Sequence, residues 1–250
     1  MQNNADVRVV PVFESFKESF HGGNVSSDAG EEIALDEIEV QTWNGGPLKL
    51  RPDASHFITI LDGQMVIDND GIQATLKEYC YGTFPGDTQV AGNGNAIIVS
   101  SVNYKSMALF GGPLETDGRL KYVDGCTNSL LLAPPVKGEP CLNFLNLPSG
   151  THQTPHTHPT IRVGMVVSGY GRCGTKGDPL IFEPGSVFII PPDALHSFQT
   201  DDANIRIILF HPDSVVGPTD TDQTMLNNTF VEGVSAKGLT ELHTREKETA

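Results

Sequence analysis

Histidines are concentrated in the segment GTHQTPHTHPTIRVGMVVSGYG, residues 150–171, which holds three of the eight histidines of the chain. His156 and His158 lie two residues apart there, and Arg162 follows four residues later. His196 comes after a proline-rich turn in the sequence EPGSVFIIPPDALHSFQT. Three neutral imidazoles can bind a first-row divalent metal and leave positions open for water or substrate. The pattern predicts a metal centre formed by these three histidines.

Strand alternation would relate the arginine to the histidines. In a regular β-strand, His156, His158, Thr160 and Arg162 point to the same face. A single histidine on such a face is commonly structural, but three at these spacings favour a metal. Arginine has no lone pair to offer and stays charged, so the metal would keep its full double charge. We therefore expect an anion to compensate the guanidinium.

Two sources of that anion are open. A substrate carboxylate could bridge the metal and Arg162 through charge-assisted hydrogen bonds. Alternatively, Arg162 extends towards the mouth of the site and pairs with an acidic residue such as Asp178 or Glu183. We expect His211, which ends a strand, to be structural or to support the metal ligands. The residues expected to contact substrate, besides Arg162, are Thr160, Phe198, Tyr170 and His152.

The elements that must position these residues have the pattern of β-strands. Short runs rich in Val, Ile, Leu and Phe alternate with Gly, Pro, Asn and Asp. Turn signals include LDGQ, DNDG, GNGN, VSGYG and EPGS. The sequence predicts an all-β fold with strands at 33–43, 56–61, 64–68, 96–102, 129–132, 142–147, 161–167, 186–190 and 205–210.

An internal repeat organises the strands. A shift of 106 residues aligns three pairs of turn residues without a gap, namely Gly63 with Gly169, Pro85 with Pro191 and Asp87 with Asp193. We interpret this as two copies of one β unit. The predicted divisions are an N-terminal arm (1–30), a first unit (31–110), a linker (111–126), a second unit (127–212) and a C-terminal tail (213–250).

The first copy lacks the histidines. The shift places Leu50, Pro52 and Val90 where the second copy has its three expected ligands, so the first copy cannot hold a metal in that way. His56 takes the place of Arg162. We expect the first unit to serve as a packing partner or lid, and a separate ligand pocket around His56 is the alternative.

The histidine segment resembles the first motif of the cupin superfamily. That motif has Gly150, then His156 and His158 after five residues, then Arg162 and Gly169 at the expected distances. The family commonly has Glu at the position of Arg162.

The second cupin motif is matched as well. Gly185 is followed at the expected spacings by Pro191, Asp193 and His196. Asp193 stands where Gly is more usual, and Thr200 stands where Asn often occurs. The resemblance implies two tandem cupin barrels (double-stranded β-helix or jelly-roll), a bicupin with a metal-binding second barrel and a degenerate first one.

The resemblance also implies an activity. Cupin sites with three histidines and no carboxylate are similar to those of Fe(II) dioxygenases, so we expect one divalent metal per chain, with Fe(II) favoured over Zn, Mn or Ni. The expected substrate is a small carboxylate or enolate. Two alternatives stay open: a metal-dependent isomerase or lyase, for which Tyr170 and His152 are weak candidate bases, and a non-catalytic cupin that binds a small anion.

Composition limits the partners. The chain has 31 acidic and 16 basic residues, a formal net charge of -15, and no run of Lys or Arg. We therefore expect neither nucleic acid nor a membrane as a partner. The four cysteines are scattered, which is typical of reduced thiols, and the start of the chain has no signal-peptide pattern. These features predict a cytoplasmic monomer or homodimer.

Overall fold

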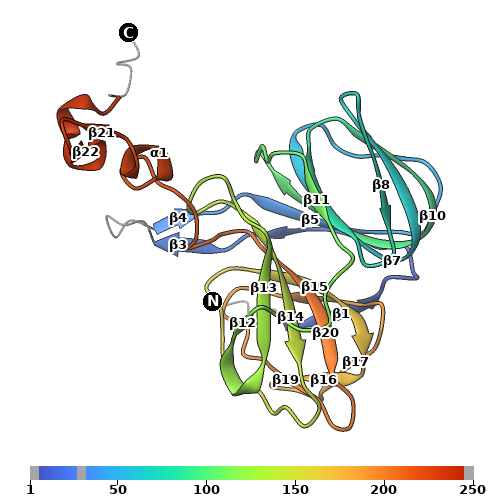
Figure 1. Cartoon of the computed structure of the whole chain (residues 1–250). Coiled ribbons are helices and arrows are strands. Elements are labelled where there is room, and N and C mark those ends of the chain that lie inside the picture. The colour runs from blue at the N-terminus through green and yellow to red at the C-terminus, as the bar shows by residue number, and fades with distance from the viewer. Residues whose placement is uncertain (1–5, 27–31, 245–250) are drawn as a thin grey trace.

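The computed structural model describes residues 6–26 and 32–244, and its regular elements are almost all strands. Among the described residues, helical turns are limited to η1 (Val123–Gly125) and to short turns near the C-terminus. The prediction of an all-β fold is therefore confirmed. The strands form two β units, which lie one against the other (Figure 1).

The first β unit is one strongly bent sheet of eight strands. Its main path runs through β11 (Leu109–Gly111), β9 (Tyr81–Pro85), β7 (Ala54–Asn69), β10 (Thr88–Val102), β5 (Glu37–Trp43) and β2 (Lys17–His21). Off this path, β8 (Ile72–Lys77) pairs with β7, and β6 (Leu48–Lys49) pairs with β10.

The second β unit has a large sheet and a small one. The large sheet has the order β1 (Arg8–Pro11), β18 (Ser186–Ile190), β15 (Arg162–Gly169), β20 (Ile205–His211), β14 (Cys141–Leu147), β13 (Thr127–Leu132) and β12 (Leu120–Lys121). The small sheet has the order β17 (Leu180–Phe182), β16 (Gly171–Gly174) and β19 (Ser197–Gln199).

Strand pairing has the same register in both units. His56 in β7 lies opposite Phe84 in β9, and Arg162 in β15 lies opposite Ile190 in β18. Each member of the second pair stands 106 residues after its counterpart, as the sequence repeat requires. The repeat therefore extends from turn residues to the pairing of strands.

Two of the expected turns are instead bends within long strands. β7 continues through LDGQ, and β10 continues through GNGN, so the predictions of chain reversals there are wrong. Gly63 and Gly94 lie opposite each other at the bend. A Cβ on Gly63 would approach Asn93 O to 2.2 Å, so glycine permits the close approach of the two strands.

The N-terminal segment connects the two units. β1 pairs with β18 of the second unit, and β2 pairs with β5 of the first. The expected strand 33–43 is divided, because β4 (Glu32–Ala34) pairs with β3 (Asn24–Ser26) and β5 starts separately at Glu37. The segment thus supplies an edge strand to each large sheet.

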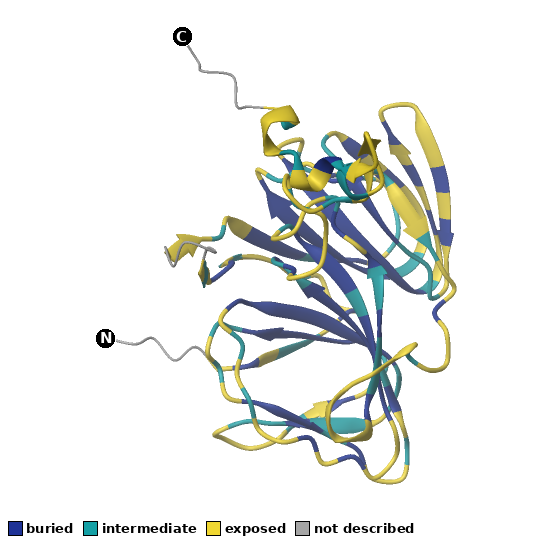
Figure 2. Ribbon diagram, turned by 60° about the vertical axis from the view of Figure 1, so that its left-hand side comes forward, coloured by how far each residue is buried: buried dark blue, intermediate teal, exposed yellow. Residues whose placement is uncertain are grey.

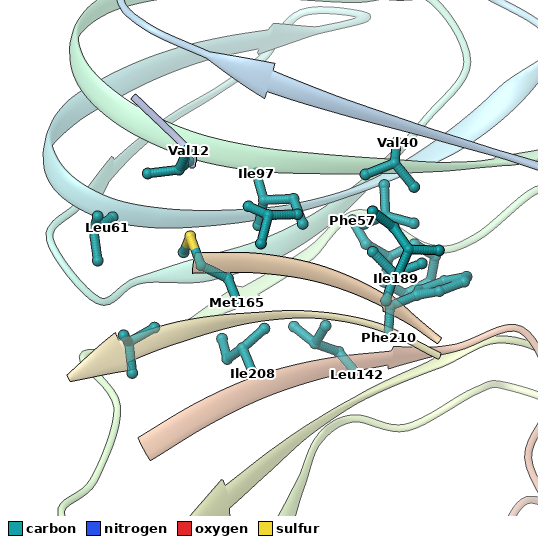
Figure 3. Packing of buried hydrophobic residues seen from close by; sticks show 14 of the residues in the cluster. Val12, Val40, Phe57, Leu61, Ile97, Leu142, Met165, Ile189, Ile208 and Phe210 are labelled. Atoms are coloured by element: carbon teal, nitrogen blue, oxygen red, sulfur yellow. The ribbon is translucent and has the colours of Figure 1, made fainter. Parts of the chain in front are cut away.

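The largest core cluster lies between the two large sheets. Alternate residues of each sheet face the other unit, and their side chains meet there (Figure 3). The rings of Phe57 and Phe210, one from each unit, are 4.9 Å apart in an edge-to-face arrangement. The remaining inward faces form a separate core inside each unit. Buried residues accordingly follow the strands, and loops are exposed (Figure 2).

The C-terminal segment leaves the second unit after β20. It forms α1 (Thr224–Asn227), a hairpin of β21 (Phe230–Val231) and β22 (Val234–Ser235), and the turns η2 (Ala236–Gly238) and η3 (Thr240–Leu242), set to one side of the units (Figure 1). Within the described part of the chain, no helix has the length and apolar character required to cross a bilayer. All four cysteines are free thiols, as their scattered positions predicted.

Candidate metal centre

The histidines of the first motif lie in an irregular segment, which differs from the expected strand. β15 begins only at Arg162, and His156 makes a single bridge to His196. Pro155 and Pro159 flank the two histidines, and proline cannot donate to a β ladder. The residues before each proline are also restricted. The histidines are therefore held by a loop rather than by a regular strand.

The three histidines nevertheless converge. His156, His158 and His196 offer ligand nitrogens that lie within 4.8 Å of one another. Their ring centroids are 4.5, 5.0 and 5.2 Å apart. A metal about 2.1 Å from each nitrogen would require centroid separations between about 4.6 Å for right-angle coordination and about 5.3 Å for tetrahedral coordination. Two of the observed separations lie within this range and the third is about 0.1 Å below it, so the three rings fit a single ion.

Hydrogen bonds orient two of the rings. His156 Nδ1 lies 2.8 Å from Thr154 O, and His196 Nδ1 lies 2.9 Å from Ala194 O. A carbonyl oxygen only accepts, so each Nδ1 is the protonated donor, and in the neutral ring Nε2 then keeps its lone pair. This is the tautomer that binds a metal through Nε2.

Burial favours the neutral form of several histidines at the site. It lowers the pKa of His158 to about 3 and that of His196 to about 4, with Arg162 and the neighbouring histidines adding to the effect. Burial also places the pKa of His211 well below its ordinary value. At neutral pH these imidazoles are unprotonated and available as ligands or hydrogen-bond partners.

A cavity of about 90 Å³ adjoins the three histidines. Its walls come from β13, β14, β15, β18, β19 and β20, from the loops that carry Gln153 and the three histidines, and from the linker residue Tyr122. No carboxylate is found among the described residues that line it. Those residues are Tyr122, Asn128, Asn143, Phe144, Leu145, Gln153, His156, His158, Arg162, Ile190, His196, Phe198, Leu209 and His211.

Arg162 reaches this cavity from the first residue of β15. Its side chain is buried, and the hydrogen bonds of its guanidinium come from Nη1, which contacts Thr160 Oγ1 and lies 3.4 Å from Asp213 Oδ1. Thr160 also donates to Asp213 at 2.6 Å. Nε is buried without a partner. Burial lowers the pKa of Arg162, and Asp213 opposes that change.

The acidic partner of Arg162 differs from those expected. We named Asp178 and Glu183, but the residue that pairs with Arg162 is Asp213, just beyond the end of β20. The alternation of side chains along a strand could have identified Asp213, because the inward-facing residues Leu209 and His211 precede it at intervals of two. The prediction missed Asp213 because we assigned it to the tail.

Only some of the residues expected to contact substrate line the cavity. Phe198 lines the cavity with Arg162. Thr160 is fully buried behind Arg162 and does not line the cavity. Tyr170 is 61% exposed at the hairpin, and His152 is exposed and makes a bridge to Gln199. His211, expected in a structural or supporting role, is part of the cavity wall.

The backbone conformation at Asp193 explains why the second motif usually has glycine at this position. Asp193 has a φ of 61°, in the left-handed region that favours glycine. Asp tolerates this conformation better than most residues. Its N–H donates to His158 O at 2.7 Å, so the turn also fixes the backbone beside an expected ligand.

The linker between the units is hydrogen-bonded to the loop that carries His156. Asp124 Oδ2 accepts a hydrogen bond from Thr154 N at 2.7 Å, and the carbonyl of Thr154 is the acceptor for His156 Nδ1. Asp124 has a φ of 53°, a conformation sparsely populated by residues other than glycine. An exposed linker residue is thus connected through two hydrogen bonds to a candidate metal ligand.

The first unit has no comparable cluster among the described residues. Leu48 lies opposite Val90 as His156 lies opposite His196, so strand pairing makes Leu48, rather than the expected Leu50, the counterpart of His156. His56 is buried, and its ring nitrogens contact Ser100 Oγ and two backbone carbonyls. Its hydrogen bonds are satisfied within the sheet.

Comparison with known sequences matches part of the chain. The family described as the AraC-like ligand binding domain matches residues 146–233, which include all three histidines and Asp213. No curated protein matches the chain by sequence.

Solved structures show the fold. The chain is similar to a cupin 2 conserved barrel domain protein from Leptotrichia buccalis, with a TM-score of 0.53 and 14% identity over 79% of this chain and 89% of the other. It is also similar to salicylate 1,2-dioxygenase from Pseudaminobacter salicylatoxidans, with a TM-score of 0.54 and 12% identity over 71% of each chain. A structure of that enzyme's adducts with gentisate gives a TM-score of 0.54 and 11% identity over 71% of this chain and 68% of the other. The chain therefore has a cupin fold.

Proposed function

We propose that this chain is a bicupin enzyme in which His156, His158 and His196 hold one divalent metal, with Fe(II) favoured, and that it acts as a dioxygenase on a small anionic substrate. The observation that carries the proposal is the convergence of three imidazoles on a cavity that also receives a buried guanidinium. Structural similarity to a salicylate 1,2-dioxygenase supports the oxygen chemistry.

Different residues of the chain would have different roles in this activity. Bound iron would supply the electron transfer between substrate and oxygen. Arg162 would bind and orient a substrate carboxylate through its Nε and the remaining guanidinium edge. Apolar walls such as Phe198 and Leu209 would exclude bulk water, which strengthens these polar contacts. The first unit would support the second through the shared core.

Oxygen uptake tests the proposal. The protein is reconstituted with Fe(II) under anaerobic conditions and mixed with oxygenated buffer and a panel of small carboxylates and 1,3-dicarbonyl enolates. We expect oxygen consumption with at least one member of the panel, and its loss in His156→Ala. Iron-loaded protein that consumes no more oxygen than this variant across the panel would contradict the proposal.

A second candidate is a non-catalytic module that binds a small anion, and the match to an AraC-like ligand binding domain favours it. In that case an anion would stabilise the protein without being converted. A third candidate, the isomerase or lyase, requires a base beside the metal. His211 and Tyr122 line the cavity and are better placed for that role than Tyr170 or His152. Conversion of a substrate without oxygen would favour this class.

A further inference from the structure

The size of the cavity limits the ligand. Its volume is about 90 Å³, whereas sites for drug-sized molecules commonly measure about 300–1,000 Å³. A cavity of about 150 Å³ is known to hold one benzene ring. The space beside the three histidines is smaller than that and must also accommodate the groups bound to a metal. From this volume we expect an aromatic ring to be excluded.

The walls resist widening. Phe144, Leu145, Ile190, Phe198 and Leu209 are all buried, and each belongs to a strand of the second unit. Leu145, Ile190 and Leu209 each stand beside a residue of the core between the units, and Phe144 itself belongs to that core. A close-packed core has little free volume to give, so expansion of the cavity would displace packed side chains at an energetic cost.

Two unpartnered polar atoms indicate the chemistry of the ligand. Arg162 Nε is a donor and Asn128 Oδ1 is an acceptor, and both are buried without a hydrogen bond in the structure. Both residues line the cavity. Buried polar atoms without partners are costly, so a ligand that satisfies them gains affinity. A short molecule with a carboxylate and a hydroxyl offers the complementary acceptor and donor.

We infer that the ligand of this site is a short aliphatic carboxylic acid, of the size of acetate or glycolate, and not an aromatic acid such as the gentisate named in the related structure. The inference rests on the proposed anion site at Arg162 and adds the class of substrate. It separates this chain from its structural relative by the volume of the cavity rather than by the fold.

Binding of four probes tests the inference. The protein is loaded with zinc, which is redox-inert, and titrated calorimetrically with acetate, glycolate, benzoate and gentisate. We expect acetate and glycolate to bind at least tenfold more tightly than either aromatic acid, and glycolate to bind most tightly. Benzoate or gentisate binding as tightly as the aliphatic acids would overturn the inference, and so would the absence of aliphatic binding.

A pair of variants on β20 separates cavity size from general stability. Leu209→Ala removes side-chain carbons from the cavity wall, and we expect it to raise the affinity for benzoate at least tenfold. Ile208→Ala removes the same number of carbons from the opposite face of the strand, where they pack between the units. It should leave the selectivity unchanged. Equal selectivity in both variants would also overturn the inference.

The outcome is independent of oxygen chemistry. If aliphatic acids bind selectively but the iron form consumes no oxygen, the class of ligand stands and the dioxygenase proposal fails. If oxygen is consumed with an aromatic acid that binds as tightly as acetate, the dioxygenase proposal stands and the inference about size fails.

Discussion

The ion pair behind the cavity provides a quantitative prediction. Arg162 Nη1 and Asp213 Oδ1 are 3.4 Å apart, and their side chains are 9% and 20% exposed. At an effective dielectric constant of about 20, charges at this separation attract by about 5 kcal/mol. Asp213→Asn leaves a buried guanidinium without its carboxylate, and the loss of one partner of a buried pair costs about 3–5 kcal/mol. We therefore expect the free energy of unfolding to fall by about 3 kcal/mol.

The matched control is Asp201→Asn. Asp201 pairs with Arg172 on the surface, where the side chains are 60% and 29% exposed, so its loss should cost much less than the loss of Asp213. Urea unfolding of the metal-free proteins should be followed by circular dichroism, because the single tryptophan, Trp43, lies in the first unit. A bound carboxylate should stabilise the Asp213 variant more than the wild type. Equal losses in the two variants would refute the argument that burial makes this pair important.

Three further predictions concern the surroundings of the site. Asp124→Ala should weaken metal affinity about 10-fold or more, because outer hydrogen bonds orient ligands, whereas Asp178→Ala on an exposed loop should not; equal affinities in a chelator competition would contradict this. The lowered pKa values of His158 and His196, about 3 and 4, mean that the unfolded chain binds protons below about pH 6.5 while the folded protein does not. Metal-free protein should therefore lose up to about 1.4 kcal/mol per pH unit for each histidine between about pH 6.5 and 4. Their Gln variants should show shallower pH dependence in urea titrations, and an unchanged slope would count against burial of these rings. Tyr170→Phe should leave oxygen uptake and anion affinity unchanged. A tenfold loss of either would show that Tyr170 contributes to the site.

Much of the fold follows from sequence patterns. Alternating and continuous apolar runs predict strands such as 186–190, which matches β18 residue for residue. The repeat predicts the shared register because Gly63 and Gly169 both hold a positive φ, of 76° and 86°, which favours glycine. The bends in β7 and β10 were mistaken for turns, since glycine marks both a reversal and a close approach of two strands.

The site is predicted less completely because it joins distant parts of the chain. Spacing identifies the three histidines, but the partner of Arg162 depends on where β20 ends, and Asp213 lies 51 residues away in sequence. The positions of Tyr122 and Asp124 depend on how the linker crosses the second unit. Neither position follows from a local pattern. The volume of the cavity depends on packing from six strands and has no sequence signal of its own.

The central claim is that three histidines bind one metal ion in the second unit. The most direct measurement is elemental analysis of protein purified without a metal-binding tag, for the wild type and for His158→Ala. The account predicts about one divalent metal per chain, with iron as the principal element, and its loss in the variant. Wild-type protein that takes up no divalent metal, or a variant that retains the full amount, would contradict it.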